Sequence, residues 1–284
     1  MSPARRGRPP RQSRPRGPEP PRRRTTGERA RGVGGEQVEG RQAVRELLVA
    51  GRRKVHEVVL AAGMDEADIL EDIVELAAAA RVPVRTVART KFDSLARTDA
   101  PQGVLARAAA LAEVDLDVLA RRSRNGPAPF LVAVDGVTDP GNLGALIRSA
   151  EGNGVTGIVL PRHRAVHVTP AVTKAAAGAV EHVAIAVVGG LPTAIRRLQD
   201  LGVWVVGLDA GGPQPIERLT LAEEPVALVL GAEGRGLSRL VRSRCDVLAS
   251  LTLRGRLSSL NVAAAGAIAC YEVARHRAEA GTAD

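Results

Sequence analysis

The chain has 284 residues, of which 45% are hydrophobic, so it is long enough for about two domains with apolar cores. Only four residues are aromatic, which disfavours recognition of nucleic-acid bases by stacking on aromatic side chains. The formal net charge is +9, and it is concentrated at the N-terminus, where the first 35 residues hold eleven arginines and two glutamates. The remainder is neutral, so the basic segment points to a polyanionic partner, nucleic acid before membrane.

Cysteine usage and hydropathy predict a cytoplasmic protein without a membrane partner. Cys245 and Cys270 do not have paired or CxxC spacing, so we expect two free thiols that behave as small apolar side chains. The basic N-terminus is not followed by the apolar stretch of a secretory signal. No run of about 18 apolar residues is present to span a membrane.

The N-terminal part of the chain predicts a tail and a small domain. Residues 1–35 are rich in Arg, Pro and Gly, so we predict a disordered tail that attracts RNA, with a solvated leader of no function as the alternative. Residues 36–109 predict a small α/β domain. Its expected elements are a helix through Val44 and Leu48, strands at 55–60, 82–87 and 103–106, and a helix from Ile69 to Ala77. A linker at 110–128 follows, with a short helix at 115–122 and a break at Asn125-Gly126-Pro127.

Residues 129–284 predict a larger α/β domain. Apolar strand candidates alternate with helical segments, which is typical of a mostly parallel sheet covered by helices on both faces. The strands are expected at 130–134, 157–160, 183–187, 203–208, 226–230 and 247–253, and the helices at 143–153, 170–178, 191–198 and from Val262 onward. Ligands of such sheets bind at the edge formed by the carboxyl ends of the strands.

Three motifs lie in this larger domain. The first is Asn142-Leu143-Gly144 followed by Arg148, after a turn at Asp139-Pro140-Gly141, and we expect Asn142 to cap the helix that carries Arg148. The second is Gly231-Ala232-Glu233-Gly234-Arg235-Gly236-Leu237, whose glycines allow a flat ligand to lie against bare backbone. The third is Ser259-Leu260-Asn261-Val262. Alone, the glycine-rich loop is equally compatible with a crowded turn between a strand and a helix.

In order and spacing, the three motifs resemble those of the SpoU (TrmH-type) family of RNA ribose 2′-O-methyltransferases. The resemblance covers residues 130 to 277, and residues 36–109 are similar to the family's small substrate-binding domain. It implies a trefoil-knotted sheet, a homodimer, and S-adenosylmethionine as cofactor. The two-domain layout is most like bacterial members that methylate a guanosine of 23S rRNA. Methylation of a tRNA guanosine, or of an rRNA adenosine in antibiotic resistance, stays open.

The resemblance also implies roles for individual residues. The backbone positions that would hold the adenosyl part of the cofactor are Gly231, Leu251 and Leu260. The side chains that would surround the reacting ribose are Asn142, Arg148, Glu233, Ser259 and Asn261. Because guanidinium stays protonated, we expect Arg148 to act as a cation toward phosphate and developing alkoxide, with Glu233 or water accepting the proton. Ser259 and Asn261 are also ordinary helix caps, which is the alternative for both.

Other classes of site fit the sequence less well. A dinucleotide-binding oxidoreductase is disfavoured, because residues 231–236 have the order G-x-x-G-x-G rather than G-x-G-x-x-G. A non-catalytic ribosome-binding factor would need neither Arg148 nor Asn261. His163 and His167 are four residues apart but are not followed by a third ligand of suitable spacing, so we expect no metal site.

Overall fold

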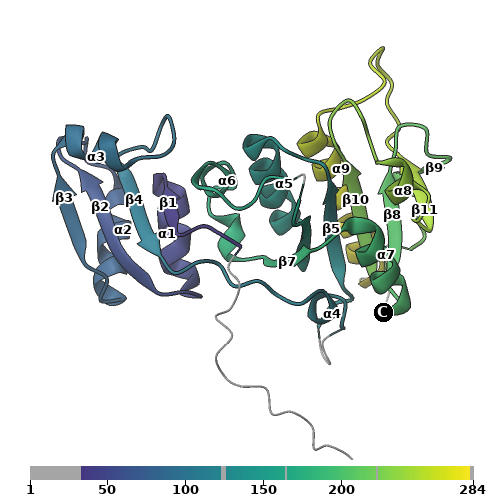
Figure 1. Ribbon diagram of the computed structural model, residues 1–284, viewed down its shortest axis with the longest axis horizontal. Helices are drawn as coiled ribbons and strands as arrows, with labels where there is room; N and C mark the ends of the chain where they lie inside the picture. The colour runs from purple at the N-terminus through teal and green to yellow at the C-terminus, as the bar shows by residue number, and fades with distance from the viewer. Residues whose placement is uncertain (1–32, 123–125, 164, 222, 282–284) are drawn as a thin grey trace, which may run out of the picture. The chain divides into compact units, whose positions relative to one another are not determined.

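The computed structural model describes residues 33–122, 126–163, 165–221 and 223–281 (Figure 1). The tail predicted for residues 1–35 lies outside the described residues, except for 33–35, where the prediction of disorder is wrong because Val33 is buried and hydrogen-bonded to Leu111. Two β-sheets organise the described part of the chain. None of the helices in these ranges is long and apolar enough to cross a membrane.

The N-terminal sheet belongs to a small α/β domain, as the sequence predicts. Its four strands are ordered β1 (Gln37–Glu39), β4 (Val104–Ala108), β2 (Val55–Ala61) and β3 (Val84–Val87). One face shares a core with α1 (Arg41–Ala50) and α2 (Asp68–Ala79), and α3 (Arg89–Leu95) packs Phe92 against the other. The sequence does not predict β1, because three residues are too few for an alternation to show.

The second sheet has seven strands, and every neighbouring pair is parallel, which confirms the predicted sheet type. Its order is β7 (Ala184–Val188), β6 (Gly157–Pro161), β5 (Phe130–Asp135), β10 (Val226–Gly231), β8 (Trp204–Leu208), β11 (Val247–Ser250) and β9 (Gln214–Pro215). In β5, Val132 and Val134 enter one core, whereas Leu131 and Ala133 enter the other. Burial on both faces explains why these strands are continuous apolar runs.

Helices pack on both faces of this sheet (Figure 1). One core contains residues of α5 (Pro140–Gly152), α6 (Pro170–Ala175), α9 (Val262–Gly281) and the 3-10 turns η1 (Ala179–Glu181) and η2 (Ile216–Arg218). The other core contains residues of α4 (Leu116–Leu119), α7 (Leu191–Asp200) and α8 (Arg239–Arg242). The helix α4 lies within the segment that we expect to be a linker, and its Leu119 is buried.

The predicted cap of α5 is wrong. The helix begins at Pro140, and Asp139 is its cap, with Oδ1 accepting a hydrogen bond from Asn142 N at 2.7 Å. Proline suits the first helical position because its missing N–H is one that a helix leaves unpaired. The side chain of Asn142 is therefore not needed for capping and is available for other contacts.

Two other predicted boundaries are also wrong. The helix α6 ends at Ala175 instead of residue 178, because Ala177 and Gly178 adopt positive φ angles of 48° and 88°. The strand β11 ends at Ser250 instead of residue 253. Its last ladder partner is Pro215, which has no backbone N–H to continue the pairing.

The segments that enter and leave the small domain are anchored in the core of the larger one. Val33 N donates a hydrogen bond to Leu111 O at 2.8 Å, and Leu111 N donates to Gly34 O at 2.9 Å. Val33 and Leu111 are both buried in the same core as Phe130. The two segments are thus hydrogen-bonded to each other, and both are packed into the core of the larger domain.

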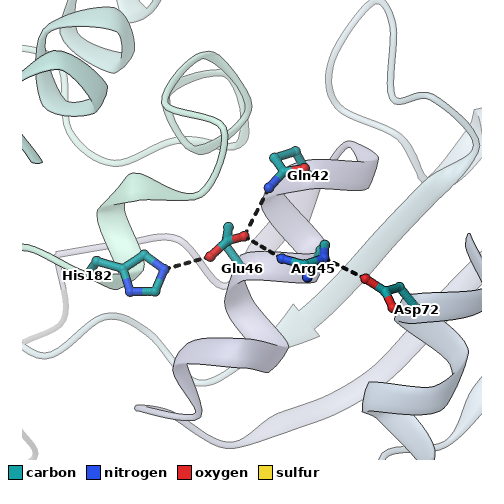
Figure 2. A network of polar contacts seen from close by, with 5 residues as sticks. All are labelled: Gln42, Arg45, Glu46, Asp72 and His182. Atoms are coloured by element: carbon teal, nitrogen blue, oxygen red, sulfur yellow. Dashed lines mark hydrogen bonds and ion pairs between the residues drawn. The ribbon is translucent and has the colours of Figure 1, made fainter. Parts of the chain in front are cut away.

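A polar network connects α1 to the residue after η1. Figure 2 shows Glu46 accepting hydrogen bonds from Gln42 and Arg45, while His182 Nε2 lies 2.8 Å from Glu46 Oε2. Arg45 also donates to Asp72 on α2 at 2.8 Å. The network therefore links two helices of the small domain to the turn that contains η1.

A buried ion pair makes a second connection at η1. Arg53 Nη2 lies 2.5 Å from Glu181 Oε1, and the two side chains are only 5% and 1% exposed. Arg53 Nη1 also donates to the carbonyl oxygens of Gly35 and Ala109, each at 2.6 Å. One guanidinium therefore binds η1 and the backbone on either side of the small domain.

Candidate active site

A cavity of about 720 Å³ opens at the carboxyl edge of the seven-stranded sheet, a size within the usual range for small-molecule sites. The ends of β8 and β10 and the segment 251–260 form its walls. Gly231, Leu251 and Leu260, the backbone positions that the family resemblance implies, all line it.

The glycine-rich loop is a tight turn at the mouth of this cavity. Gly236 N donates to Ala232 O at 2.8 Å, which leaves residues 233–235 at the tip. Gly234 and Gly236 adopt left-handed φ angles of 75° and 63°. A Cβ at Gly231 would lie 2.1 Å from the carbonyl carbon of Gly236, so a side chain at this position would not fit. The glycines therefore bring bare backbone to the cavity wall.

A line of hydrogen bonds connects the three motifs. Asn261 Oδ1 accepts from the backbone N–H of Ala263 at 2.9 Å, at the start of α9. Asn261 Nδ2 donates to Asn142 Oδ1 at 2.9 Å, and Asn142 Nδ2 donates to Glu233 Oε2 at 3.2 Å. Asn261 thus caps α9 and also contacts the first motif, so the two sequence interpretations of this residue are compatible.

The backbone of α9 fixes the direction of every bond in this line. A backbone N–H can only donate, so the oxygen of the Asn261 amide must face the helix and its NH₂ must face Asn142. Asn142 then presents its oxygen to Asn261 and its NH₂ to Glu233. The carboxylate at the end of the line is consequently placed as an acceptor.

Arg148 and Ser259 are not part of this line. Arg148 lies on α5, six residues beyond Asn142, is exposed, and does not line the cavity. Its side chain has no hydrogen bond or ion pair with another described residue. Ser259 lines the cavity but is exposed, and its hydroxyl likewise has no partner within the described ranges.

Three charged cavity residues are not among the site residues expected from the sequence: Arg235, which lies within the second motif, Arg256 and Asp209. Arg235 is at the turn tip with Glu233, and Arg256 comes from the segment before the third motif. Asp209 follows β8, so its position is predictable from the rule that parallel strands end at one edge. The Arg242 guanidinium donates to Asp209 at 2.9 Å and lowers the pKa of that carboxyl.

Within the described ranges, no group of three or more His, Cys, Asp or Glu side chains is placed to hold a metal ion. His167 Nε2 lies 3.1 Å from the backbone oxygen of Arg162.

Comparison with known proteins identifies relatives of both domains. The model of the SpoU rRNA Methylase family matches residues 129–271, and that of the RNA 2′-O ribose methyltransferase substrate-binding domain matches residues 37–114. A putative TrmH family tRNA/rRNA methyltransferase of Bacillus subtilis is 36% identical over 84% of this chain and 94% of the relative. A 23S rRNA (guanosine-2′-O-)-methyltransferase of Shewanella oneidensis is 38% identical, over 84% and 96%.

Solved structures agree with these relatives. The SpoU methyltransferase AviRb from Streptomyces viridochromogenes, in complex with the cofactor AdoMet, aligns with a TM-score of 0.70 at 25% identity, covering 86% of this chain and 90% of that one. An AdoMet-bound rRNA methyltransferase from Sinorhizobium meliloti aligns with a TM-score of 0.68 at 27% identity, covering 84% and 87%.

Proposed function

Because this chain belongs to the SpoU rRNA methylase family, we propose that it methylates the ribose 2′-hydroxyl of a guanosine in 23S rRNA. That it is an S-adenosylmethionine-dependent RNA ribose 2′-O-methyltransferase follows from the family and its relatives. The observation that carries the finer proposal is the relative named for 23S rRNA guanosine, whose similarity extends over both sheets. We further propose that residues 36–109 bind RNA, that 110–128 link the domains, and that 129–284 hold the methyltransferase.

The cavity fits S-adenosylmethionine. Gly231, Gly234 and Gly236 line the cavity without side chains, so a flat group can lie against their backbone. Leu253 and Leu260 line the cavity with 36% and 38% of their surfaces exposed, and an adenosyl group would cover that apolar surface. We propose that Gly231, Leu251 and Leu260 hold this part of the cofactor. When bound, the cofactor supplies a methyl group made electrophilic by its sulfonium.

The protein residues would orient the ribose and accept its proton. Glu233 Oε2 is occupied by Asn142, whereas Oε1 has no partner among the described residues. We assign Glu233 as the general base for the 2′-hydroxyl, with Asn142 and Asn261 holding the carboxylate in place. Ser259 would donate a hydrogen bond to the ribose or the cofactor. The main contribution is alignment of the 2′-oxygen with the methyl group.

We propose a homodimer as the active form. Ile268 and Tyr271 on α9 are 42% and 58% exposed, and α9 packs beside α5, which carries the exposed Arg148. Large apolar side chains exposed in this way favour contact with a protein surface. A second copy would cover them and allow Arg148 to contact a phosphate of the RNA bound to the other subunit. We also propose that the chain forms a trefoil knot in this sheet and that the protein is cytoplasmic.

A methyl-transfer assay tests the substrate. Purified protein, S-adenosylmethionine labelled on its methyl group, and transcripts of 23S rRNA or tRNA are combined, and the modified nucleoside is identified after digestion. We expect label in 2′-O-methylguanosine from 23S rRNA and none with Glu233→Gln. Label only in tRNA, or in 2′-O-methyladenosine, would contradict the proposal that the substrate is a guanosine of 23S rRNA. Heat of binding with NAD but not with S-adenosylmethionine would contradict the enzyme class.

A further inference from the structure

Two arginines at the mouth of the cavity have no carboxylate partner. Arg235 is at the tip of the same turn as Glu233, and Arg256 enters from the segment that precedes the third motif; both are exposed and both line the cavity. Neither side chain is hydrogen-bonded or ion-paired to any residue in the described ranges. Arg242, in contrast, is paired with Asp209.

The charges around the cavity are therefore unbalanced. Its acidic lining residues are Asp209, which Arg242 neutralises, and Glu233, whose single negative charge is outnumbered by the two positive charges of Arg235 and Arg256. Arg235 and Arg256 remain as unpaired cations at the opening. Because residues 36–284 are neutral overall, this local excess of positive charge is not a consequence of a basic domain. Such an arrangement suits an anion that arrives with the substrate.

The substrate of the proposed reaction carries that anion at a fixed place. In RNA, the 3′-phosphate is attached to the ribose carbon next to the one that bears the 2′-hydroxyl. A 2′-hydroxyl placed at Glu233 therefore brings its own 3′-phosphate to the neighbouring wall. Cα atoms two residues apart are separated by at most about 7 Å, so Arg235 is within reach of that phosphate.

We propose that Arg235, supported by Arg256, binds the phosphate on the 3′ side of the target ribose. A planar guanidinium binds two phosphate oxygens at once. Neutralising this phosphate also favours loss of the 2′-hydroxyl proton, because the developing alkoxide is then less repelled. Arg235 thus contributes, from the same chain as Glu233, a phosphate contact in addition to the one that the family resemblance implies for Arg148. The inference rests on the proposed ribose 2′-O-methylation.

Arg235→Ala, Arg235→Lys and the matched control Arg239→Ala test this proposal. Arg239 is a nearby exposed arginine at the start of α8 that does not line the cavity. Its side chain has no hydrogen bond or ion pair with another residue in the described ranges. The readouts are the KM for RNA, the single-turnover rate, the pH dependence of that rate, the salt dependence of RNA binding, and the affinity for S-adenosylmethionine.

For Arg235→Ala we expect kcat/KM to fall on the order of 10²-fold, as when one preorganised charge-stabilising donor is removed. The salt slope of RNA binding should fall by roughly 0.7 to 0.9, the value for one phosphate that the protein no longer neutralises. The pH-rate profile should shift to higher pH, and cofactor affinity should not change. Arg235→Lys should recover part of the activity, and Arg239→Ala should stay within about twofold of wild type because its charge is outside the cavity.

Two results would overturn the inference. One is that wild type methylates RNA while Arg235→Ala matches Arg239→Ala in rate and salt slope, which leaves the proposed function intact. The other is that Arg235→Ala loses S-adenosylmethionine affinity with an unchanged salt slope, which places Arg235 on the cofactor. Absence of 2′-O-methylation by the wild type would instead refute the proposed function itself.

Discussion

Removing the guanidinium of Arg53 should destabilise the protein far more than removing an exposed arginine. The Glu181 carboxylate is 1% exposed, and Arg53 is the side chain that pairs with it. Removing one partner of a buried ion pair lowers the free energy of unfolding by about 3–5 kcal/mol, because the other charge stays buried without its partner. Arg53→Met also leaves the carbonyls of Gly35 and Ala109 without this donor.

The matched control is Arg89→Met. Arg89 pairs with Asp93, but the two side chains are 60% and 55% exposed, and such pairs contribute about 0.2–1 kcal/mol. Urea unfolding followed by circular dichroism gives both free energies of unfolding. At roughly 2–4 °C per kcal/mol for a chain of this size class, Arg53→Met should lower the Tm by at least about 6 °C.

A double variant separates the loss of the ion-pair attraction from the cost of leaving the Glu181 carboxylate buried without a partner. Arg53→Met with Glu181→Met removes both charges, so it should be more stable than Arg53→Met alone. A double variant that is the less stable of the two, or a single variant within about 1 kcal/mol of Arg89→Met, would refute the reasoning.

Four further predictions concern the candidate site, the two thiols and the basic segment. Asn261→Ala should lower the single-turnover rate on the order of 10²-fold, with S-adenosylmethionine affinity kept and about 0.5–2 kcal/mol of stability removed at the α9 cap; normal rates with early melting would reduce Asn261 to a cap. Arg148→Ala should abolish turnover with little effect on cofactor affinity, and near-normal rates for Arg148→Lys would exclude a bidentate phosphate contact. Burial raises the pKa of the Cys245 and Cys270 thiols to about 12, so iodoacetamide at pH 8 should label them only after unfolding; rapid native labelling would contradict this. Deleting residues 1–32, which keeps the buried Val33 and the bonds of 34–35, should reduce the salt slope of RNA binding by roughly 0.7 to 0.9 for each phosphate that the segment neutralises, and an unchanged slope would show that this segment does not bind RNA.

The central strands of the large sheet are predictable from sequence because each is a short apolar run buried on both faces. Phe130 to Val134 and Val226 to Leu230 are examples. The start of α5 is also encoded locally, because Pro140 at the first helical position points to Asp139 as the cap, yet Asn142 is an equally good cap by residue type alone. The strand β9 is not predictable, since its two residues form a strand only by pairing with β11.

The residues of the candidate site can be found by motif order, but their connections cannot. Asn142 and Glu233 are 91 residues apart, and Asn261 is 119 residues from Asn142. No local periodicity encodes contacts over such separations. Arg235 does not stand out in the sequence, because its importance depends on which side chains near the cavity are already paired.

The claim that this chain methylates a guanosine of 23S rRNA is tested most directly by mapping 2′-O-methyl groups. Total rRNA and tRNA are compared between a strain that lacks the gene and the same strain carrying either wild type or Glu233→Gln. We predict that one guanosine of 23S rRNA loses its methyl group in the deletion strain, regains it with wild type and does not regain it with the variant. An unchanged 23S rRNA map, or a loss confined to tRNA, would contradict the claim.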